Sequence, residues 1–258
     1  MAKSNDVGML MTVVEAFTEF NGAFLNTLKG LSTAPGNTIR GFLADPASGQ
    51  YINPFRFAVL TISAYVVCAS LLGMDMSADF VEGFEAGKGS TLTDAEKQGA
   101  EFTGNLLDNS IMFVTLISLV PTAWLMSKLF SSSGQNSITC YKVALYAYGM
   151  STAIYLLLAL PIVLIFPDTY EARQGDIMGL LTLITVPYII WFYTDYFQVS
   201  IVSGIWKTIV TMSWNIVIYM LLIMVTTIGS LAYMDANKPA DQDAQTSLTA
   251  QVNKNLLG

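Results

Sequence analysis

The 258-residue chain carries too little charge to cover a soluble globule, since charged residues make up 12% of it and apolar residues 53%, against about 25% charged residues in soluble domains. Its net charge of −7 argues against a nucleic-acid partner, because binding to phosphates needs a basic surface. The absence of histidine excludes His-ligated haem, His-containing zinc sites and Ser-His-Asp triads.

The first 56 residues predict a cytoplasmic region at the membrane interface. Apolar residues recur there at steps of three and four: Leu10, Val13, Val14, Phe17, Phe20, Phe24, Leu28 and Leu31. A polar stripe opposes them: Thr12, Glu15, Glu19, Gly22, Asn26 and Lys29. This pattern predicts an amphipathic helix that lies flat at the interface. The bilayer, the protein's own bundle and a partner protein are all open as the surface that its apolar face covers.

The segment between this helix and the first apolar stretch predicts turns around one short helix. Pro35-Gly36 and Pro46 punctuate the segment, which leaves room for a helix over Asn37–Ala44. Asn53-Pro54 then opens the first span, because proline in the first turn of a helix removes no hydrogen bond.

Five uncharged stretches, each bounded by charge, predict five transmembrane helices. They cover residues 57–74, 109–127, 143–167, 177–194 and 208–234. A helix needs about 20 apolar residues to cross roughly 30 Å of hydrocarbon. The predicted fold class is therefore all-α: a polytopic transmembrane helical bundle over 57–234, preceded by the interfacial helix. An acidic outer loop (75–108), with a helix capped by Thr93, follows the first span, and a polar tail (235–258) follows the last.

The basic residues predict which side of the membrane each segment faces. With the N-terminus inside, the cytoplasmic segments hold seven basic and five acidic residues, and the opposite side holds five basic and fourteen acidic residues. Basic residues concentrate in the cytoplasmic flanks of membrane proteins. The N-terminus is therefore predicted to lie inside and the C-terminus outside.

The stretch before the first span carries the most specific pattern, Pro-Gly, then Ile-Arg-x-Phe-Leu, then Tyr-x-Asn-Pro-Phe-x-Phe. The matching residues are Pro35, Gly36, Ile39, Arg40, Leu43, Tyr51, Asn53, Pro54, Phe55 and Phe57. This order resembles a family of uncharacterised bacterial integral membrane proteins whose layout is similar to that of the five-helix Yip-type proteins. The resemblance implies the bacterial inner membrane as the location and, by analogy, a role in membrane trafficking or curvature.

Four polar residues at or inside the spans are candidates for a site. Asp195 ends the fourth span, with Arg56 and Lys207 at the same membrane level, which predicts an interfacial ion pair; a carboxylate for proton-coupled transport is the alternative. Asn215 lies about two turns into the fifth span, where its amide is expected to bond across helices. Lining a polar pathway is the alternative for Asn215.

The third span contains a small-xxx-small step, Gly149 to Ala153, which lets another helix backbone approach closely. Packing within the bundle is the expected use, and self-association into a homo-oligomer is the alternative. Pro121, Pro161 and Pro187 each remove a backbone hydrogen bond and are expected to kink their helices.

Together these features predict a non-enzymatic membrane protein. Cys68 and Cys140 form no CxxC pair and are expected to be ordinary buried residues, so no catalytic residue, cofactor or metal is predicted. We expect an accessory or scaffold subunit whose partners are membrane lipids and other membrane proteins. A small transporter or channel that uses Asp195 and Asn215 is the alternative, and a Yip-like membrane-shaping protein is the second alternative.

Overall fold

The computed structural model describes residues 22–71, 85, 89, 94–166 and 174–236. The chain divides into two compact units. The first joins the residues up to Met74 with Met112–Tyr219, and the second joins Asp75–Ile111 with the residues from Met220 onwards. Every candidate site residue lies in the first unit.

The described residues are helical apart from short connections. The elements are α2 (Gly22–Thr33), α3 (Pro35–Ala44), α4 (Pro54–Leu71), α6 (Asp94–Leu129), the 3-10 turn η1 (Ser131–Ser133), α7 (Ser137–Ile165), α9 (Gln174–Phe197) and α10 (Ile201–Ala236). Within the part of the chain that the structure describes, four stretches are long and apolar enough to cross a membrane: Met112–Leu129, Ser137–Ile165, Gly179–Phe197 and Ile201–Gly229. The predicted all-helical architecture of membrane type is confirmed. The apolar stretch of α4, Pro54–Ala69, is shorter, and residues 72–74 lie outside the described residues, so the fifth span stays a prediction.

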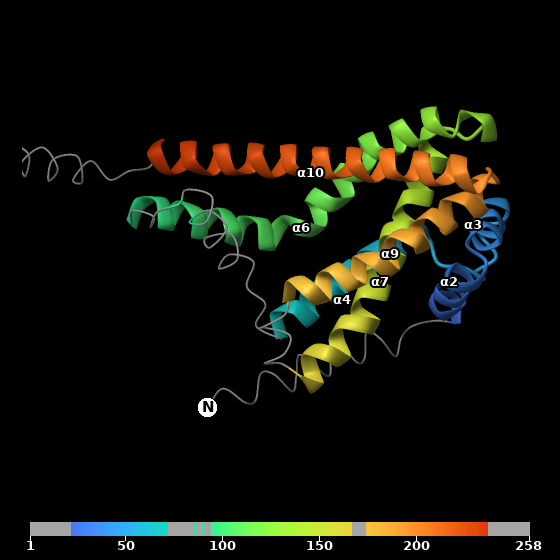
Figure 1. Cartoon of the computed structure of the whole chain (residues 1–258), viewed down its shortest axis with the longest axis horizontal. Helices are drawn as coiled ribbons and strands as arrows, with labels where there is room; N and C mark the ends of the chain where they lie inside the picture. Colours follow the sequence, from blue (N-terminus) through green and yellow to red (C-terminus); the bar gives the residue numbers. More distant parts are fainter. Residues whose placement is uncertain (1–21, 72–84, 86–88, 90–93, 167–173, 237–258) are drawn as a thin grey trace, which may run out of the picture. The chain divides into compact units, whose positions relative to one another are not determined.

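α2 and α3 form a helical hairpin before α4 (Figure 1). A single residue, Ala34, connects them, and Gly30 lies so close to Thr38 that a Cβ atom at residue 30 would overlap the threonine side chain. The predicted proline-glycine turn is wrong, because Pro35 and Gly36 are the first two residues of α3. Proline favours this position because its missing N–H has no partner in the first turn of a helix.

The two faces of α2 have different surroundings. Phe24, Thr27 and Leu31 are buried, while Asn26 and Lys29 are exposed. α2 packs against α3 and α7, so this part of the predicted apolar stripe covers the protein's own bundle. Residues 10–20, the rest of the predicted amphipathic helix, lie outside the described residues, and its interfacial location stays a prediction.

Two long helices extend beyond the charged residues that bound the predicted spans. α6 begins at Asp94 and continues past Asp108, and α10 begins at Ile201, before Lys207. The predicted spans begin at residues 109 and 208, inside these helices, so those bounds mark the uncharged stretches and not the ends of the helices. A charged residue marks the end of the hydrocarbon, but it keeps its backbone hydrogen bonds and lets the helix continue into water. Thr93 and the tail after residue 236 lie outside the described residues.

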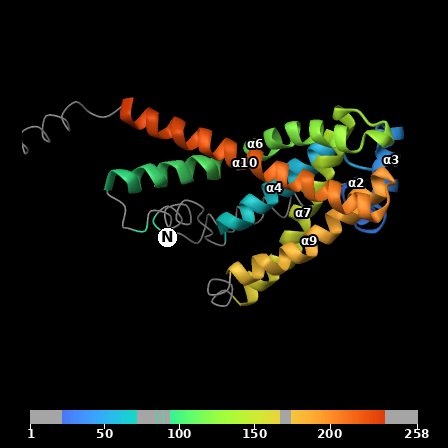
Figure 2. The same ribbon diagram turned by 45° about the horizontal axis from the view of Figure 1, so that its top comes forward.

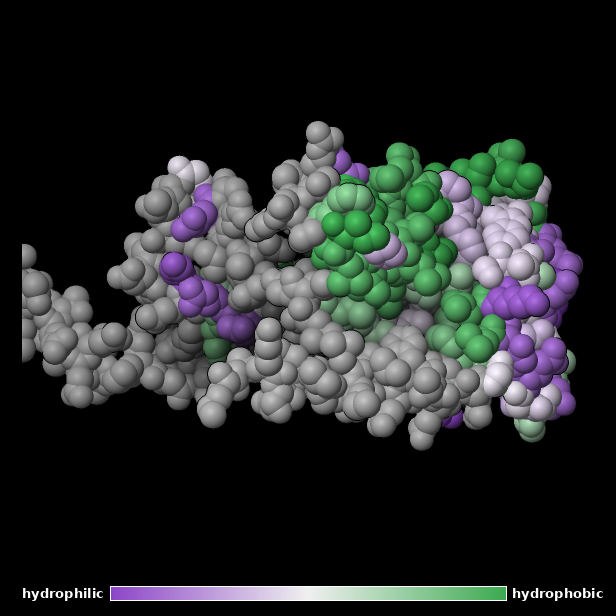
Figure 3. Space-filling view, turned by 90° about the horizontal axis from the view of Figure 1, so that it is seen from below, coloured by the Kyte–Doolittle hydropathy of each residue, from purple (hydrophilic) through white to green (hydrophobic). Residues whose placement is uncertain are grey.

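α10 has the polarity of a helix that faces lipid. Its buried residues in the first unit are small or hydroxylated: Gly204, Thr208 and Thr211. Apart from Ser213, its exposed residues in that unit are large and apolar: Ile201, Val202, Ile205, Trp206, Ile209, Ile216 and Val217. Helices in water expose their polar residues instead, so the exposed apolar face of α10 is explained if lipid surrounds it. Figure 3 shows hydrophobic surface over the first unit and hydrophilic residues at the end of that unit that carries α3.

The packing of the first unit brings the hairpin to the end of α9. α4 lies along α7, and α3 lies on α9 (Figure 2). Fully buried aromatic residues fill the core below the hairpin: Phe57, Phe130, Tyr146 and Phe192. Pro121, Pro161 and Pro187 lie inside α6, α7 and α9 without ending them. The N-terminal end of α3 thereby meets the C-terminal end of α9.

Candidate functional site

Asp195 lies in the last turn of α9 and binds the first turn of α3. Its Oδ2 accepts a hydrogen bond from the backbone N–H of Gly36 at 2.7 Å. The first turn of a helix has N–H groups without intrahelical partners. Ala34 has no side-chain acceptor to cap them and Pro35 has no N–H, so Gly36 presents the first donor. Asp195 caps α3 from another helix, and its negative charge faces the positive end of the α3 dipole.

Arg40 makes the reverse connection, from α3 to the C-terminal end of α9. Its Nη1 donates to the carbonyl oxygens of Tyr196 at 3.0 Å and Asp195 at 3.3 Å, and its Nη2 donates to Oδ1 of Asn37 at 3.0 Å. Carbonyls in the last turn of a helix lack intrahelical partners and favour a cation. Gly36, Arg40 and Asp195 thus form a reciprocal cap, in which each helix supplies the charge that the other helix end needs.

The reciprocal cap explains why residue 36 is glycine. A Cβ atom there would lie 2.6 Å from the carbonyl oxygen of Asp195, 2.7 Å from its Oδ2 and 2.8 Å from Nη2 of Arg40. Side chains do not tolerate contacts this short. The Pro35-Gly36 pair therefore has two separate roles: proline starts α3, and glycine lets α9 reach it.

Further hydrogen bonds fasten the chain before α4. The Tyr188 hydroxyl of α9 donates to the Leu31 carbonyl at 3.0 Å, and the Tyr146 hydroxyl of α7 donates to the Ile52 carbonyl. The Ile52 N–H donates to Oγ1 of Thr27 at 2.9 Å. A largely buried tyrosine commonly brings its hydroxyl to such a partner. The hairpin is therefore held at α2, at α3 and at the segment that leads into α4.

Among the described residues, neither Arg56 nor Lys207 forms an ion pair with Asp195. Arg56 is exposed in the first turn of α4. Lys207 lies over the ring of Phe130, 5.1 Å from its centroid, and that ring stacks on Phe197 with the centroids 4.0 Å apart. Within the described residues, Asp195 therefore meets the motif before the first span and neither of its two predicted partners.

Asn215 connects α10 with α6, which confirms the predicted bond across helices. Its Nδ2 donates to Oγ1 of Thr122 at 3.1 Å and lies 3.4 Å from Oγ of Ser118. Both hydroxyl residues are buried, so the amide has polar partners in an apolar environment. Asn215 also borders a cavity of about 240 Å³ between α6, α7, α9 and α10. The other polar residues around it are Thr122, Tyr148, Ser151, Thr185, Tyr193 and Thr211.

Gly149 and Ala153 are buried on α7. A Cβ atom at Gly149 would lie 2.7 Å from a ring carbon of Phe57 and 3.1 Å from Oγ1 of Thr61. Both neighbours belong to α4 of the same chain. The small-residue step therefore makes the contact that is expected for packing within the bundle.

The sequence identifies the members of the reciprocal cap separately but does not predict their contact. Asp195 stands out as the charge that ends the fourth span, and Pro35, Gly36 and Arg40 stand out as a motif. The signal that could join them is the start of α3, where Ala34-Pro35 supplies no capping side chain. Tyr146 offers no such signal, because tyrosines are common in membrane helices near the interface.

Comparisons of the chain with family models, with curated proteins and with solved structures find no match. The resemblance to Yip-type proteins rests on the motif before the first span and stays a prediction. Function is therefore argued from the residues that the fold brings together.

Proposed function

We propose that the chain is a non-enzymatic protein of the bacterial inner membrane, an accessory or scaffold subunit that displays its α2–α3 hairpin on the cytoplasmic face of a five-helix bundle. The reciprocal cap is the observation that carries the proposal. It commits the Asp195 carboxylate and the Arg40 guanidinium to backbone groups, which leaves them poorly suited to proton transfer or substrate binding. A hairpin held at several points suits protein binding, because less conformational entropy is lost when a partner docks.

The reciprocal cap also supports a fifth span by parity. The hydrogen bond between Gly36 and Asp195 requires these residues to lie on the same side of the membrane. A chain that leaves and returns to one side crosses an even number of times. The three apolar stretches between them, in α6, α7 and α9, are an odd number. A crossing by α4 makes the number even, and α10 is then the fifth span of the proposed bundle.

The distribution of charge supports the orientation. The described basic residues of the first unit lie on the hairpin or near the ends of α4, α6, α7 and α10: Lys29, Arg40, Arg56, Lys128, Lys142 and Lys207. The acidic residues described on the same segments are Asp45 and Asp195. An excess of positive charge favours the cytoplasmic side, so the hairpin is assigned to the cytoplasm.

Native purification tests the scaffold role. The full-length tagged chain is extracted in mild detergent, and the mass of its particle is compared with the 28.1 kDa of the chain. We expect a larger complex that contains another membrane protein. Gly36→Leu should lose that protein, because a side chain at residue 36 drives α3 away from α9. A lone monodisperse monomer from wild-type membranes contradicts the proposal.

Gly179→Leu is the matched control for this experiment. A Cβ atom at Gly179 meets nothing within 4 Å, so the same substitution adds a side chain to α9 without touching the hairpin. We expect this variant to keep its partner. Loss of the partner from both variants to the same degree shows that the hairpin is not the docking surface.

A small transporter is the second candidate, and the cavity beside Asn215 is the observation that favours it. Polar side chains from four helices border this cavity, and polar groups inside the membrane often mark a pathway. Vesicles that contain the purified chain allow a test of ion or solute flux. Flux that survives Asn215→Ala and Asp195→Ala removes this candidate, whereas flux lost in Asn215→Ala at an unchanged unfolding temperature supports it.

A further inference from the structure

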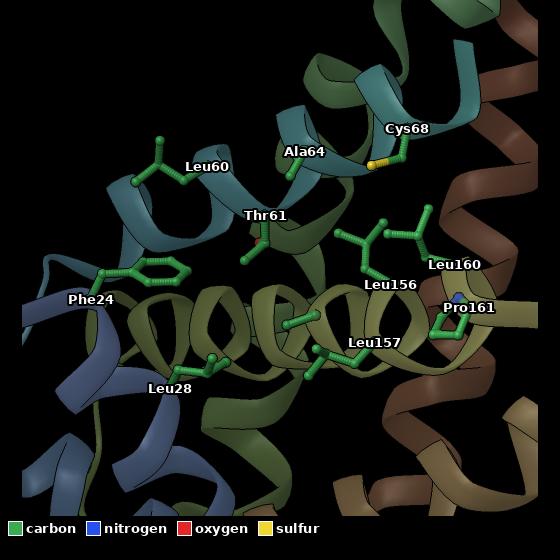
Figure 4. Close-up of a pocket in the computed structure, with 11 residues that line it drawn as sticks. Phe24, Leu28, Leu60, Thr61, Ala64, Cys68, Leu156, Leu157, Leu160 and Pro161 are labelled. Carbon is green, nitrogen blue, oxygen red and sulfur yellow. The ribbon is translucent and has the colours of Figure 1, made fainter. Parts of the chain in front are cut away.

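An apolar groove runs along α4 and α7 and is bordered at one end by α2 (Figure 4). Its volume is about 250 Å³, and its lining includes Leu60, Ala64 and Cys68 from α4, Leu156 and Leu160 from α7 and Phe24 from α2. The hydroxyl of Thr61, which also lines the groove, donates to carbonyls of its own helix. The groove therefore suits an apolar occupant.

Arg56 continues the α4 wall of this groove beyond the end that α2 borders. Residues four apart lie on the same face of a helix, so Arg56, Leu60, Ala64 and Cys68 form one row. Arg56 is exposed one turn before Leu60, and Lys29 of α2 is exposed as well. Arg56 is thus an exposed cation on the same row of α4, one turn beyond the groove lining.

The length of the groove matches one leaflet of a bilayer. Leu60 and Cys68 are eight residues apart, which is about 12 Å along the helix at a rise of 1.5 Å per residue. The hydrocarbon of one leaflet is about 15 Å deep, half of the roughly 30 Å core. A groove that starts near the first turn of α4 therefore has the depth of one acyl chain, with Arg56 at the level of the headgroups.

We propose that this groove binds one acyl chain of an anionic phospholipid and that Arg56 binds the phosphate of the same lipid. The apolar lining of the groove selects the acyl chain of the lipid. The guanidinium selects the phosphate, which it can bind with two parallel N–H groups. The inference rests on the membrane location within the proposed function and is independent of the scaffold role.

Native mass spectrometry of the full-length chain in mild detergent tests this inference. The probes are phosphatidylglycerol and phosphatidylcholine with the same acyl chains, supplied in equal amounts. We expect wild type to retain phosphatidylglycerol preferentially. Arg56→Gln should lower that preference about fivefold, the effect of one basic residue on an anionic lipid. Lys128→Gln is the matched control, because Lys128 is an exposed cation at the end of α6, away from the groove lining, and it should keep the preference.

A second pair of variants tests the groove itself. Ala64→Phe places a ring in the groove and should reduce the retention of both lipids. Leu183→Phe adds a ring at a side chain of α9 that is 72% exposed and should leave retention unchanged. Glycerol phosphate, which has the headgroup chemistry without acyl chains, should not displace the bound lipid.

Three results overturn the inference: equal retention of the two lipids by wild type, an unchanged preference in Arg56→Gln, or displacement by glycerol phosphate. Arg56 is exposed, so its replacement leaves the core packing intact and stays informative even if Ala64→Phe fails to fold. A complex with a partner protein can persist after any of these results. The lipid site and the scaffold role can therefore fail separately.

Discussion

The smallest change that tests the reciprocal cap is one methyl group at Gly36. In Gly36→Ala the new Cβ would meet the Asp195 carbonyl oxygen at 2.6 Å, so α3 and α9 have to move apart. We expect the free energy of unfolding to fall by about 1–3 kcal/mol, the usual cost of overpacking, measured by thermal unfolding in detergent. Gly179→Ala, whose Cβ meets nothing within 4 Å, should cause no loss. Equal losses in both variants contradict the close approach at Gly36.

Two substitutions at Asp195 separate its charge from its hydrogen bond. Asp195→Asn keeps an oxygen for the Gly36 N–H but removes the charge, whereas Asp195→Ala leaves that N–H without a partner. Hydrogen bonds to charged groups contribute about 1.5–3 kcal/mol and neutral ones about 0.5–1.5 kcal/mol. The unfolding temperature should therefore fall from wild type to Asn and again to Ala. Equal stability of the three proteins means that Asp195 does not act as a helix cap.

At the scale of residues, the sequence predicts which side chains need a hydrogen-bond partner but not which distant residue supplies it. Asn215 is predictable because an amide inside a span has to find a hydrogen bond, and neighbouring helices supply it. Asp195 is recognisable as a charge at the end of a span, but its partner Gly36 is 159 positions away. The predicted spans place Arg56 and Lys207 at the same membrane level as Asp195, so the sequence suggests these two cations as its partners. Only the packing of α3 on α9 selects Gly36.

At the scale of helices, Gly149 decides how closely α4 packs on α7. Gly149→Leu puts a side chain where the Phe57 ring lies, 2.7 Å from the position of the Cβ. We expect a lower unfolding temperature and an unchanged particle mass, measured by thermal unfolding and analytical ultracentrifugation in the same detergent. If Gly149 served self-association, the particle would become smaller while the stability of each chain stayed the same.

The existence of the helices is readable from the sequence, whereas their ends are not. An uncharged stretch reports where hydrocarbon surrounds the chain, but the backbone hydrogen bonds of a helix continue into water. α10 therefore begins at Ile201, although the charge of Lys207 places the start of the span later. Pro35-Gly36 shows the same difficulty in another form, since the pair that resembles a turn is the start of α3.

At the scale of the whole molecule, the number of crossings decides where the two ends of the chain lie. α4 has 18 residues, which is about 27 Å at 1.5 Å per residue and close to the roughly 30 Å of hydrocarbon. Its length alone is therefore compatible with four or five crossings in total. Four crossings put the N- and C-termini on the same side of the membrane, and five put them on opposite sides.

Reporter fusions distinguish these two arrangements. Alkaline phosphatase, which is active only outside, should be active after Gly258 and within the 75–108 loop. Green fluorescent protein, which fluoresces inside, should fluoresce at the N-terminus and at Gly134, between α6 and α7. Both termini on one side contradict five crossings. If the 75–108 reporter also lies inside, α4 is the helix that does not cross, and the reciprocal cap is contradicted as well, because three crossings would then separate Gly36 from Asp195.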